Sequence, residues 1–157
     1  MAYAYDAYAN EAAPRDELRP LSRDGHDSLA ATALTAIESL DTLLFMNLTT
    51  RYNHARNLVK NVSFAKAKSA STFEVTIRVL GGLLAAYSLT SDALYLDGAR
   101  ATGDWLLGCF GRDGAAQLPW DRAFFHDGSR RDRGPSAASV AEVGTLSLEF
   151  DTLARFS

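Results

Sequence analysis

The stretch from Ser71 to Tyr87 has the most regular spacing of hydrophobic residues in the chain. Apolar residues recur there every three or four positions in two rows, which predicts a helix that is buried on two sides. The first row is Phe73, Ile77, Leu80, Leu84 and Tyr87, and the second is Val75, Val79, Leu83 and Ala86. Ser71 can cap the first turn, and no proline interrupts the stretch. We expect the other elements to pack around this helix.

Two charges and two glycines lie in this otherwise apolar helix. Glu74 and Arg78 are four residues apart, which places their Cβ atoms about 5–6 Å from each other on one face. Burying such a pair is seldom stabilising, because desolvation can exceed the attraction. Gly81 and Gly82 allow a close approach by another backbone or by a ligand. Two interpretations stay open: a structural ion pair beside a helix crossing, or a carboxylate and an arginine that line a polar pocket.

Five further segments have helical periodicity, and the predicted fold class is therefore all-α. They are Tyr3–Ala13, Ser28–Met46, Thr49–Asn61, Asp92–Phe110 and Ala138–Phe156. The charged segment Arg15–Ser22 and the glycine-containing segment Gly111–Ser139 lack this pattern, and both are expected to be loops. In the last helix, Glu142 and Glu149 are seven residues apart, about 10.5 Å along the axis of a continuous helix.

Composition excludes some functions and leaves others open. The chain has 157 residues, of which 47% are hydrophobic and 22% charged, as in an ordinary globular domain. The net charge of −3 argues against a nucleic-acid-binding protein. Cys109 is the single cysteine, and the three histidines lack the spacing of metal ligands. We expect no membrane span, because no run of eighteen apolar residues occurs, and no signal peptide at the N-terminus.

The central helix also carries a recognisable signature. Phe73-Glu-Val-Thr-Ile-Arg-Val-Leu-Gly-Gly-Leu-Leu84 resembles the Phe-Glu-x-Thr-Ile-Arg-x-Leu-Gly-Gly-Leu-Leu motif of the class I α-1,2-mannosidases, glycoside hydrolase family 47. Three other segments resemble motifs of this family in the same order: Asp16-Glu-Leu-Arg-Pro20, Leu34-Thr-Ala-Ile-Glu-Ser-Leu-Asp-Thr-Leu43 and Ala141-Glu-Val-Gly-Thr-Leu-Ser-Leu-Glu-Phe150. Glu38 stands where the family usually has aspartate, so the hydrogen bonds of that position need not be the same.

The resemblance implies a fold and an activity. Residues 1–157 are expected to form the N-terminal third of a single catalytic domain, an (α/α)7 barrel of which only this portion is present. The implied reaction is the inverting, calcium-dependent hydrolysis of terminal α-1,2-linked mannose. The implied substrates are high-mannose N-glycans of glycoproteins in the lumen of the endoplasmic reticulum or Golgi. Any membrane anchor is expected outside this chain.

The resemblance also assigns roles to single residues. Glu74 matches the catalytic acid, and Arg78 and Glu142 match residues that contact the sugar. Possible lining residues of the barrel are Asp16, Glu17, Asp41 and Glu149. No metal ligand is expected within the chain. The catalytic aspartate, the water-activating glutamate and the calcium-binding threonine are all expected after Ser157, so we predict that these 157 residues alone are inactive.

Two other functions remain possible from the sequence. One is a glycan-binding protein of the degradation-enhancing mannosidase-like branch, which acts in quality control of the endoplasmic reticulum. Glu142 argues for the processing enzymes, because the other branch tends to lack it. A plain helical interaction module explains the periodicity but not the charges within the helices. Asn47 and Asn61 begin possible glycosylation sequons, and their modification depends on a luminal location.

Overall fold

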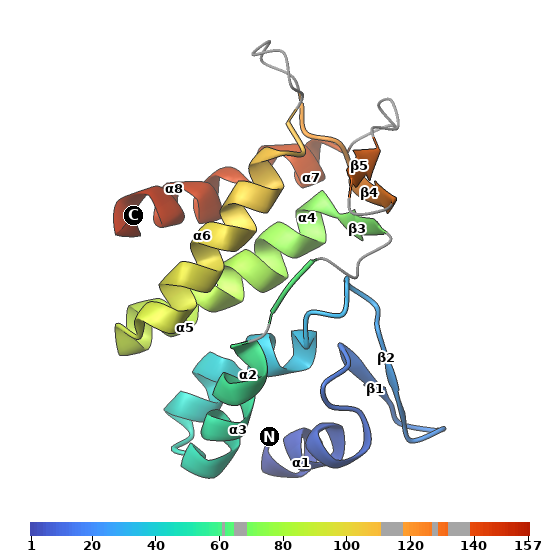
Figure 1. The fold of residues 1–157 in the computed structure, drawn as a ribbon. Coiled ribbons are helices and arrows are strands. Elements are labelled where there is room, and N and C mark those ends of the chain that lie inside the picture. The colour runs from blue at the N-terminus through green and yellow to red at the C-terminus, as the bar shows by residue number, and fades with distance from the viewer. Residues whose placement is uncertain (61, 65–68, 111–117, 127–128, 132–138) are drawn as a thin grey trace.

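The computed structural model describes residues 1–60, 62–64, 69–110, 118–126, 129–131 and 139–157, and most of them are helical (Figure 1). The helices are α1 (Ala2–Glu11), α2 (Leu34–Phe45), α3 (Thr49–Val59), α4 (Thr72–Glu74), the π-helical segment η1 (Val75–Leu80), α5 (Gly81–Thr90), α6 (Ala93–Leu107), α7 (Val140–Gly144) and α8 (Ser147–Phe156). The strands are β1 (Glu17–Arg19), β2 (Asp24–His26), β3 (Ser69–Ser71), β4 (Arg122–His126) and β5 (Ser129–Arg131).

The helices pack as neighbouring hairpins. Short links join α2 to α3 and α5 to α6, and each pair lies side by side (Figure 1). Links this short favour antiparallel neighbours. Helix α2 also packs against η1 and α5, while α8 packs against α5 and α6. The continuous helix formed by α4, η1 and α5 therefore lies between the other elements, as the sequence predicted.

The second apolar row of the central helix forms the middle of the core. Val75, Val79, Leu83 and Ala86 are fully buried. They join buried side chains of α2 and α6, among them Ile37, Leu40, Tyr95 and Leu106. The first row is less regular, because Leu80 and Leu84 are buried whereas Ile77 is exposed.

Ile77 lies in a stretch whose backbone differs from an α-helix. Residues Val75–Leu80 form a π-helix rather than an α-helix, and its i→i+5 bonding changes which side chains share a face. The hydroxyl of Thr76 donates to the carbonyl of Thr72 at 2.8 Å, a side-chain bond to the preceding turn. Ser71 caps the helix as predicted, since its Oγ accepts from the Glu74 N–H at 3.3 Å.

The two adjacent glycines of the central helix have different surroundings. A Cβ atom on Gly82 would lie 2.7 Å from Ile37 Cγ2 and 3.5 Å from the carbonyl oxygen of Ile37, so α2 approaches the helix closely there. A Cβ on Gly81 would only reach ordinary contact distance, 3.7 Å, from the side chain of Glu149. Gly82 therefore permits the close helix crossing that the sequence suggested.

Helix α2 begins six residues later than predicted, at Leu34 instead of Ser28. The preceding residues turn around the carboxylate of Asp16, which accepts the backbone N–H groups of Leu29, Ala31, Thr32 and Leu34 at 2.6–3.2 Å. Ala30, Ala31 and Ala33 have positive φ angles, which a helix cannot contain. A long-range side-chain contact thus decides where this helix starts.

Two small β-sheets were not predicted. Strand β1 pairs antiparallel with β2, with Leu18 opposite Gly25, within and just after the segment predicted as a loop. Strands β3, β4 and β5 form a second antiparallel sheet in that order. These strands have three to five residues, which is too short for alternation to be recognised in the sequence. The rest of the predicted loop 111–139 lies largely outside the described residues.

The C-terminal segment forms two helices instead of the single predicted one. Helix α7 ends at Gly144 and α8 begins at Ser147. Glu142 and Glu149 therefore belong to different helices, and the distance of about 10.5 Å along one axis does not apply. Helix α8 packs closely on α6, where Gly103 lies so near Leu153 that a Cβ would be 2.5 Å from Leu153 Cδ2.

One helix of the described residues, Thr72–Thr90, is long and apolar enough to cross a membrane by length and composition. This contrasts with the expectation of no span. The finding is weak evidence, because core helices of proteins outside membranes pass the same test. Here the helix carries Glu74 and Arg78, and Val75 and Leu83 on its inner side are fully buried by protein.

Candidate active site

The side chain of Arg78 is the meeting point of three acidic residues from three parts of the chain. Its Nε donates to Glu38 Oε1 at 2.7 Å, and its Nη2 donates to Glu38 Oε2 at 2.8 Å. Glu17 Oε1 lies 3.4 Å from Nη2. Glu74 Oε2 lies 3.7 Å from Nη1. We call Glu17, Glu38, Glu74 and Arg78 the Arg78 cluster.

The Arg78 cluster is partly open to solvent. The side chain of Glu74 is 42% exposed and that of Arg78 is 28% exposed, so the expectation of a buried pair was wrong for this chain. The hydrogen bond with Glu38 raises the pKa of Arg78; burial lowers it by less, and Glu17 and Glu74 raise it further. The guanidinium therefore stays charged while the carboxylates remain accessible to a ligand.

The chemistry of the Arg78 cluster suits a ligand with many hydroxyl groups. Carboxylate oxygens accept hydrogen bonds from hydroxyls, and guanidinium N–H groups donate to hydroxyl oxygens. A protonated carboxyl in such a site can also give its proton to a leaving oxygen. At 3.7 Å, Glu74 is farther from Arg78 than a hydrogen bond allows, so its oxygens are not occupied by that neighbour.

Asp16 does not line an open face, although it precedes Glu17 directly. It is fully buried, and the hydroxyl of Thr32 adds a fifth contact to its carboxylate at 3.2 Å. Asp41 is half-buried on α2 and accepts from the N–H and the hydroxyl of its neighbour Thr42. The structure therefore gives Asp16 a role in the backbone fold and brings only Glu17 to the Arg78 cluster.

Glu142 lies at the start of α7 and completes a capping box. Its Oε2 accepts from the Ser139 N–H at 3.1 Å, while Ser139 Oγ accepts from the Glu142 N–H at 3.2 Å. Glu142 and Phe73 both line a hollow of about 10 Å³, which has room for about one water molecule. Since Phe73 precedes Glu74, α7 lies close to the start of the central helix.

Glu149 of α8 packs against Gly81 at the start of α5. Its Cγ and Oε1 face Gly81, and together with Leu84 and Thr152 it lines a groove of about 320 Å³ between α5 and α8. Its Oε2 is enclosed without a hydrogen-bond partner among the described residues. Burying an unpaired carboxylate oxygen is costly, which marks Glu149 as a polar group without a satisfied structural role in this chain.

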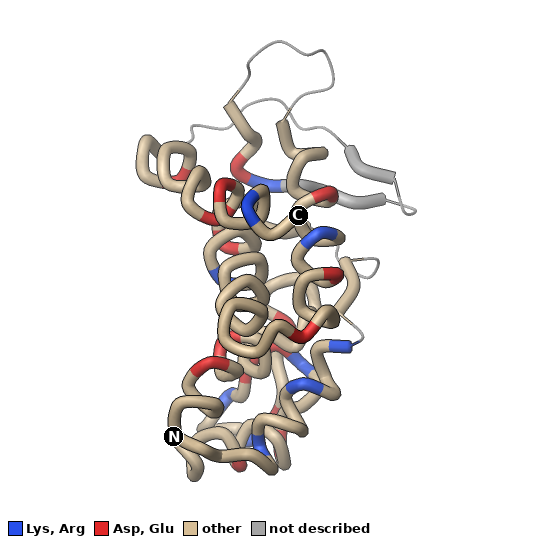
Figure 2. The backbone as a smooth tube through the Cα atoms, turned by 90° about the vertical axis from the view of Figure 1, so that its left-hand side faces the viewer, with Lys and Arg blue, Asp and Glu red and all other residues tan. Residues whose placement is uncertain are grey.

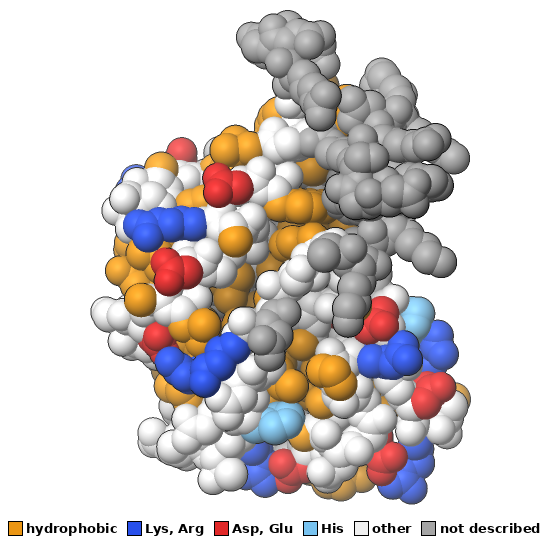
Figure 3. Space-filling model, viewed as in Figure 1, with side chains coloured by type: hydrophobic (Ala, Val, Ile, Leu, Met, Phe, Trp, Pro, Cys, Tyr) orange, Lys and Arg blue, Asp and Glu red, His pale blue; other side chains and the backbone are white. Residues whose placement is uncertain are grey.

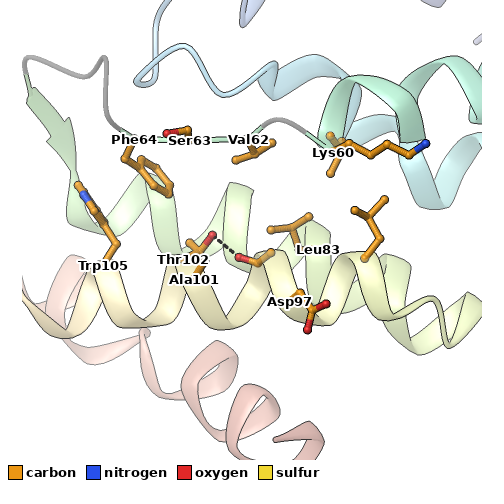
Figure 4. Close-up of a pocket in the computed structure, with 12 residues that line it drawn as sticks. Lys60, Val62, Ser63, Phe64, Leu83, Asp97, Ala101, Thr102 and Trp105 are labelled. Carbon is orange, nitrogen blue, oxygen red and sulfur yellow. Dashed lines mark hydrogen bonds between the residues drawn. The ribbon is translucent and has the colours of Figure 1, made fainter.

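A second hollow, of about 490 Å³, lies between the end of α3 and helix α6. Phe64 and Trp105 stack at one end, with ring centroids 4.5 Å apart, and Lys60 lies at the other end (Figure 4). Hydrophobic side chains gather in the middle of this face of the molecule (Figure 3). Its described lining is mainly apolar, whereas the Arg78 cluster offers three carboxyl groups and a guanidinium group for hydrogen bonds with hydroxyl groups.

Lysine and arginine positions are interspersed with aspartate and glutamate positions along the described helices (Figure 2). The absence of nucleic-acid binding stays a prediction. Among the described residues, no three His, Cys, Asp or Glu side chains are grouped so that they could hold a metal ion. The chemistry proposed below uses only protein side chains.

Comparison with known proteins decides the family. The sequence profile of glycosyl hydrolase family 47 matches residues 1–157. The chain belongs to glycosyl hydrolase family 47. A solved structure, the α-1,2-mannosidase from Trichoderma reesei, superposes with a TM-score of 0.88 at 30% sequence identity and covers 98% of this chain. The predicted fold is confirmed: the helices have the arrangement of one part of the (α/α)7 barrel of α-1,2-mannosidases.

Two curated relatives represent the two branches considered from the sequence. The mannosyl-oligosaccharide 1,2-alpha-mannosidase MNS1 of Arabidopsis thaliana is 35% identical over 99% of this chain. The ER degradation-enhancing alpha-mannosidase-like protein 2 of Mus musculus is 46% identical over 58% of this chain. This family 47 chain spans 28% of the Arabidopsis protein, 16% of the mouse protein and 34% of the solved chain.

Sequence reasoning missed one member of the Arg78 cluster as a site residue. Glu38 was noted as a charge three residues from Asp41 in an otherwise apolar segment, and as the replacement of the usual aspartate of the family motif, but it was not named as a site residue. Its contact with Arg78 joins residues 40 positions apart, and no local pattern predicts such a contact. A signal was nevertheless present, because Glu38 interrupts the apolar sequence of α2 between the fully buried Ile37 and Leu40.

Proposed function

We propose that residues 1–157 form the N-terminal third of a family 47 catalytic domain and supply the acid side of its active site. The proposed reaction is inverting hydrolysis of terminal α-1,2-linked mannose from high-mannose N-glycans. The observation that carries the proposal is the Arg78 cluster, in which an accessible carboxyl and a charged guanidinium lie four residues apart on the central helix.

Each residue of the proposed site has a separate task. An inverting glycosidase needs a carboxylic acid at the glycosidic oxygen and a carboxylate that activates water, about 6.5–9.5 Å apart. Glu74 is the proposed acid, since its carboxyl is accessible and beyond hydrogen-bond distance of Arg78. Arg78 and Glu142 are proposed to hold hydroxyl groups of the sugar. Glu17, Asp41 and Glu149 are proposed to line the barrel around it.

The proposed cellular setting follows the family. We propose a location in the lumen of the secretory pathway, with glycoproteins as partners and with calcium bound by ligands outside the described residues. The degradation-enhancing branch is the second candidate. It is less favoured because that mouse relative matches 58% of the chain, whereas the processing enzyme of Arabidopsis matches 99%, including the segment around Glu142.

Binding of α-1,2-mannobiose to the 157-residue chain, measured by ligand-detected NMR, tests the proposal. We expect weak binding that Arg78→Ala abolishes, because the guanidinium donors are removed, and that Glu74→Gln retains, because the amide still forms hydrogen bonds. Maltose serves as the control ligand. Equal binding of maltose, or no change in Arg78→Ala, would contradict the proposed site. The same samples, assayed for mannose release, test the prediction that the chain alone is inactive.

A further inference from the structure

Glu38 binds one edge of the guanidinium group of Arg78. Two parallel hydrogen bonds, from Nε at 2.7 Å and from Nη2 at 2.8 Å, join the two side chains. This fork geometry fixes the orientation of the guanidinium plane as well as its position. Glu38 comes from α2 and Arg78 from η1, so the orientation is set by a helix other than the one that carries the arginine.

The opposite edge of the guanidinium stays available. Within the described part of the chain, Nη1 makes no hydrogen bond, and Glu74 Oε2 lies 3.7 Å from it. Arginine has five N–H donors, and Glu38 accepts from only two of the nitrogen atoms that carry them. Without Glu38, the guanidinium could rotate to form the same fork with Glu74, four residues earlier on the same helix.

We propose that Glu38 is a positioning residue: it holds Arg78 so that the Nη1 edge faces a sugar hydroxyl and the carboxyl of Glu74 stays free of a bidentate ion pair. This inference deepens the proposed function and rests on it. Glu38 touches neither the sugar nor the reacting atoms; it acts through the orientation of Arg78. Glu17, with its single longer contact of 3.4 Å, contributes less to this orientation.

A purely structural ion pair is the competing explanation, and the two make different predictions. The side chains of Glu38 and Arg78 are 38% and 28% exposed. Ion pairs with this exposure contribute little to folding, so both explanations allow a small change in stability when Glu38 is replaced. Only the positioning role requires that the order of the Arg78 side chain and its affinity for a sugar change together.

The test follows the Nε–H signal of Arg78 by proton–nitrogen NMR in the 157-residue chain, assigned with Arg78→Lys. We expect hydrogen exchange at this group to become on the order of tenfold faster in Glu38→Gln, which loses the charge-assisted bond. Glu38→Asp keeps the charge but is one methylene shorter, and we expect an intermediate rate. Glu17→Gln is the matched control and should leave the rate within about twofold.

Glu38→Asp provides a second test if Glu38→Gln does not fold. An unchanged exchange rate in Glu38→Gln, or in Glu38→Asp where Glu38→Gln does not fold, would overturn the positioning role.

Titration with α-1,2-mannobiose separates this inference from the proposed function. We expect the affinity to fall on the order of tenfold in Glu38→Gln. The control is Glu11→Gln, which removes the ion pair of Glu11 with Arg23 outside the Arg78 cluster and should change the affinity little. If the wild-type chain does not bind the disaccharide but hydrogen exchange at Arg78 is faster in Glu38→Gln, the proposed function fails, whereas the orientation of Arg78 by Glu38 is supported. If the disaccharide binds equally well to wild type and Glu38→Gln, the positioning role fails and the proposed function stands.

Discussion

Asp16 and Glu17 are neighbours in the sequence, yet one carboxylate is buried and the other is exposed. Asp16 is fully buried and accepts hydrogen bonds from four backbone N–H groups. The side chain of Glu17 is 40% exposed and reaches toward Arg78. One carboxylate is enclosed by the chain, and the other is presented at the open face. The comparison teaches that, within one motif, one acidic residue can stabilise the fold while its neighbour is available to the candidate site.

Removal of the enclosed carboxylate is expected to have the largest effect. Asp16→Ala should lower the free energy of unfolding by about 3–5 kcal/mol, because each donor that stays buried and unpaired costs about 1–3 kcal/mol and some of the five donors are expected to reach water or new partners. Asp16→Asn, which keeps one acceptor oxygen, should lose less. Chemical denaturation with urea measures both. Glu17→Ala is the matched control and should stay within about 0.5 kcal/mol; equal losses at the two positions would break the comparison.

Asp92 is an intermediate case, since it caps α6 and also pairs with Arg56. Its Oδ1 accepts from the Leu94 N–H at 3.1 Å, and its Oδ2 lies 2.6 Å from Arg56. Burial raises the pKa of Asp92, but the hydrogen bonds from Arg56 and from the Leu94 N–H outweigh it, so the pKa lies below its usual value. We expect Asp92→Ala to cost about 1–2 kcal/mol at neutral pH.

The pH dependence of Asp92 follows from the sign of that shift. A carboxyl whose pKa is lowered by folding stabilises the protein above its unfolded pKa, about 3.9, and loses this contribution as the pH falls through the folded value. The difference in melting temperature between wild type and Asp92→Ala should therefore be constant above about pH 5 and shrink below about pH 4. Asp92→Asn can still cap the helix, so its difference in melting temperature from wild type should be smaller. A difference between wild type and Asp92→Ala that grows in acid would refute the stabilising role of the ionised Asp92.

The smallest effect on stability is expected at Glu142. Helix α7 has five residues and no buried side chain, so losing the capping box in Glu142→Ala should cost about 0.5 kcal/mol, at the low end for helix caps. Thermal unfolding measures this change, with Glu142→Gln as the control that keeps an acceptor. A loss of stability as large as that of Asp16→Ala would show that Glu142 is a structural residue like Asp16, and would argue against its proposed contact with the sugar.

The candidate site could be predicted only in part. The spacing of Glu74 and Arg78 placed both on one face of the central helix, and the two do lie within 3.7 Å of each other. The periodicity did not predict the π-helical segment Val75–Leu80 or the exposure of Ile77, because the spacing of apolar residues does not distinguish a short π-helical segment from an α-helix. The roles of Arg78, Glu74 and Glu142 toward a sugar remain proposals that the binding experiments address.

The sequence by itself determined the approximate positions of the main helices, the cap at Ser71 and the apolar row from Val75 to Ala86, because these depend on neighbours within a few turns. It also carried the motifs that identify the family. Only the tertiary structure decided that Asp16 folds the chain while Glu17 faces Arg78, and that Glu38 grips Arg78 from another helix. These contacts join positions that are distant in the sequence. Whether a carboxylate is buried or exposed depends on the hydrogen-bond donors that the fold brings to it.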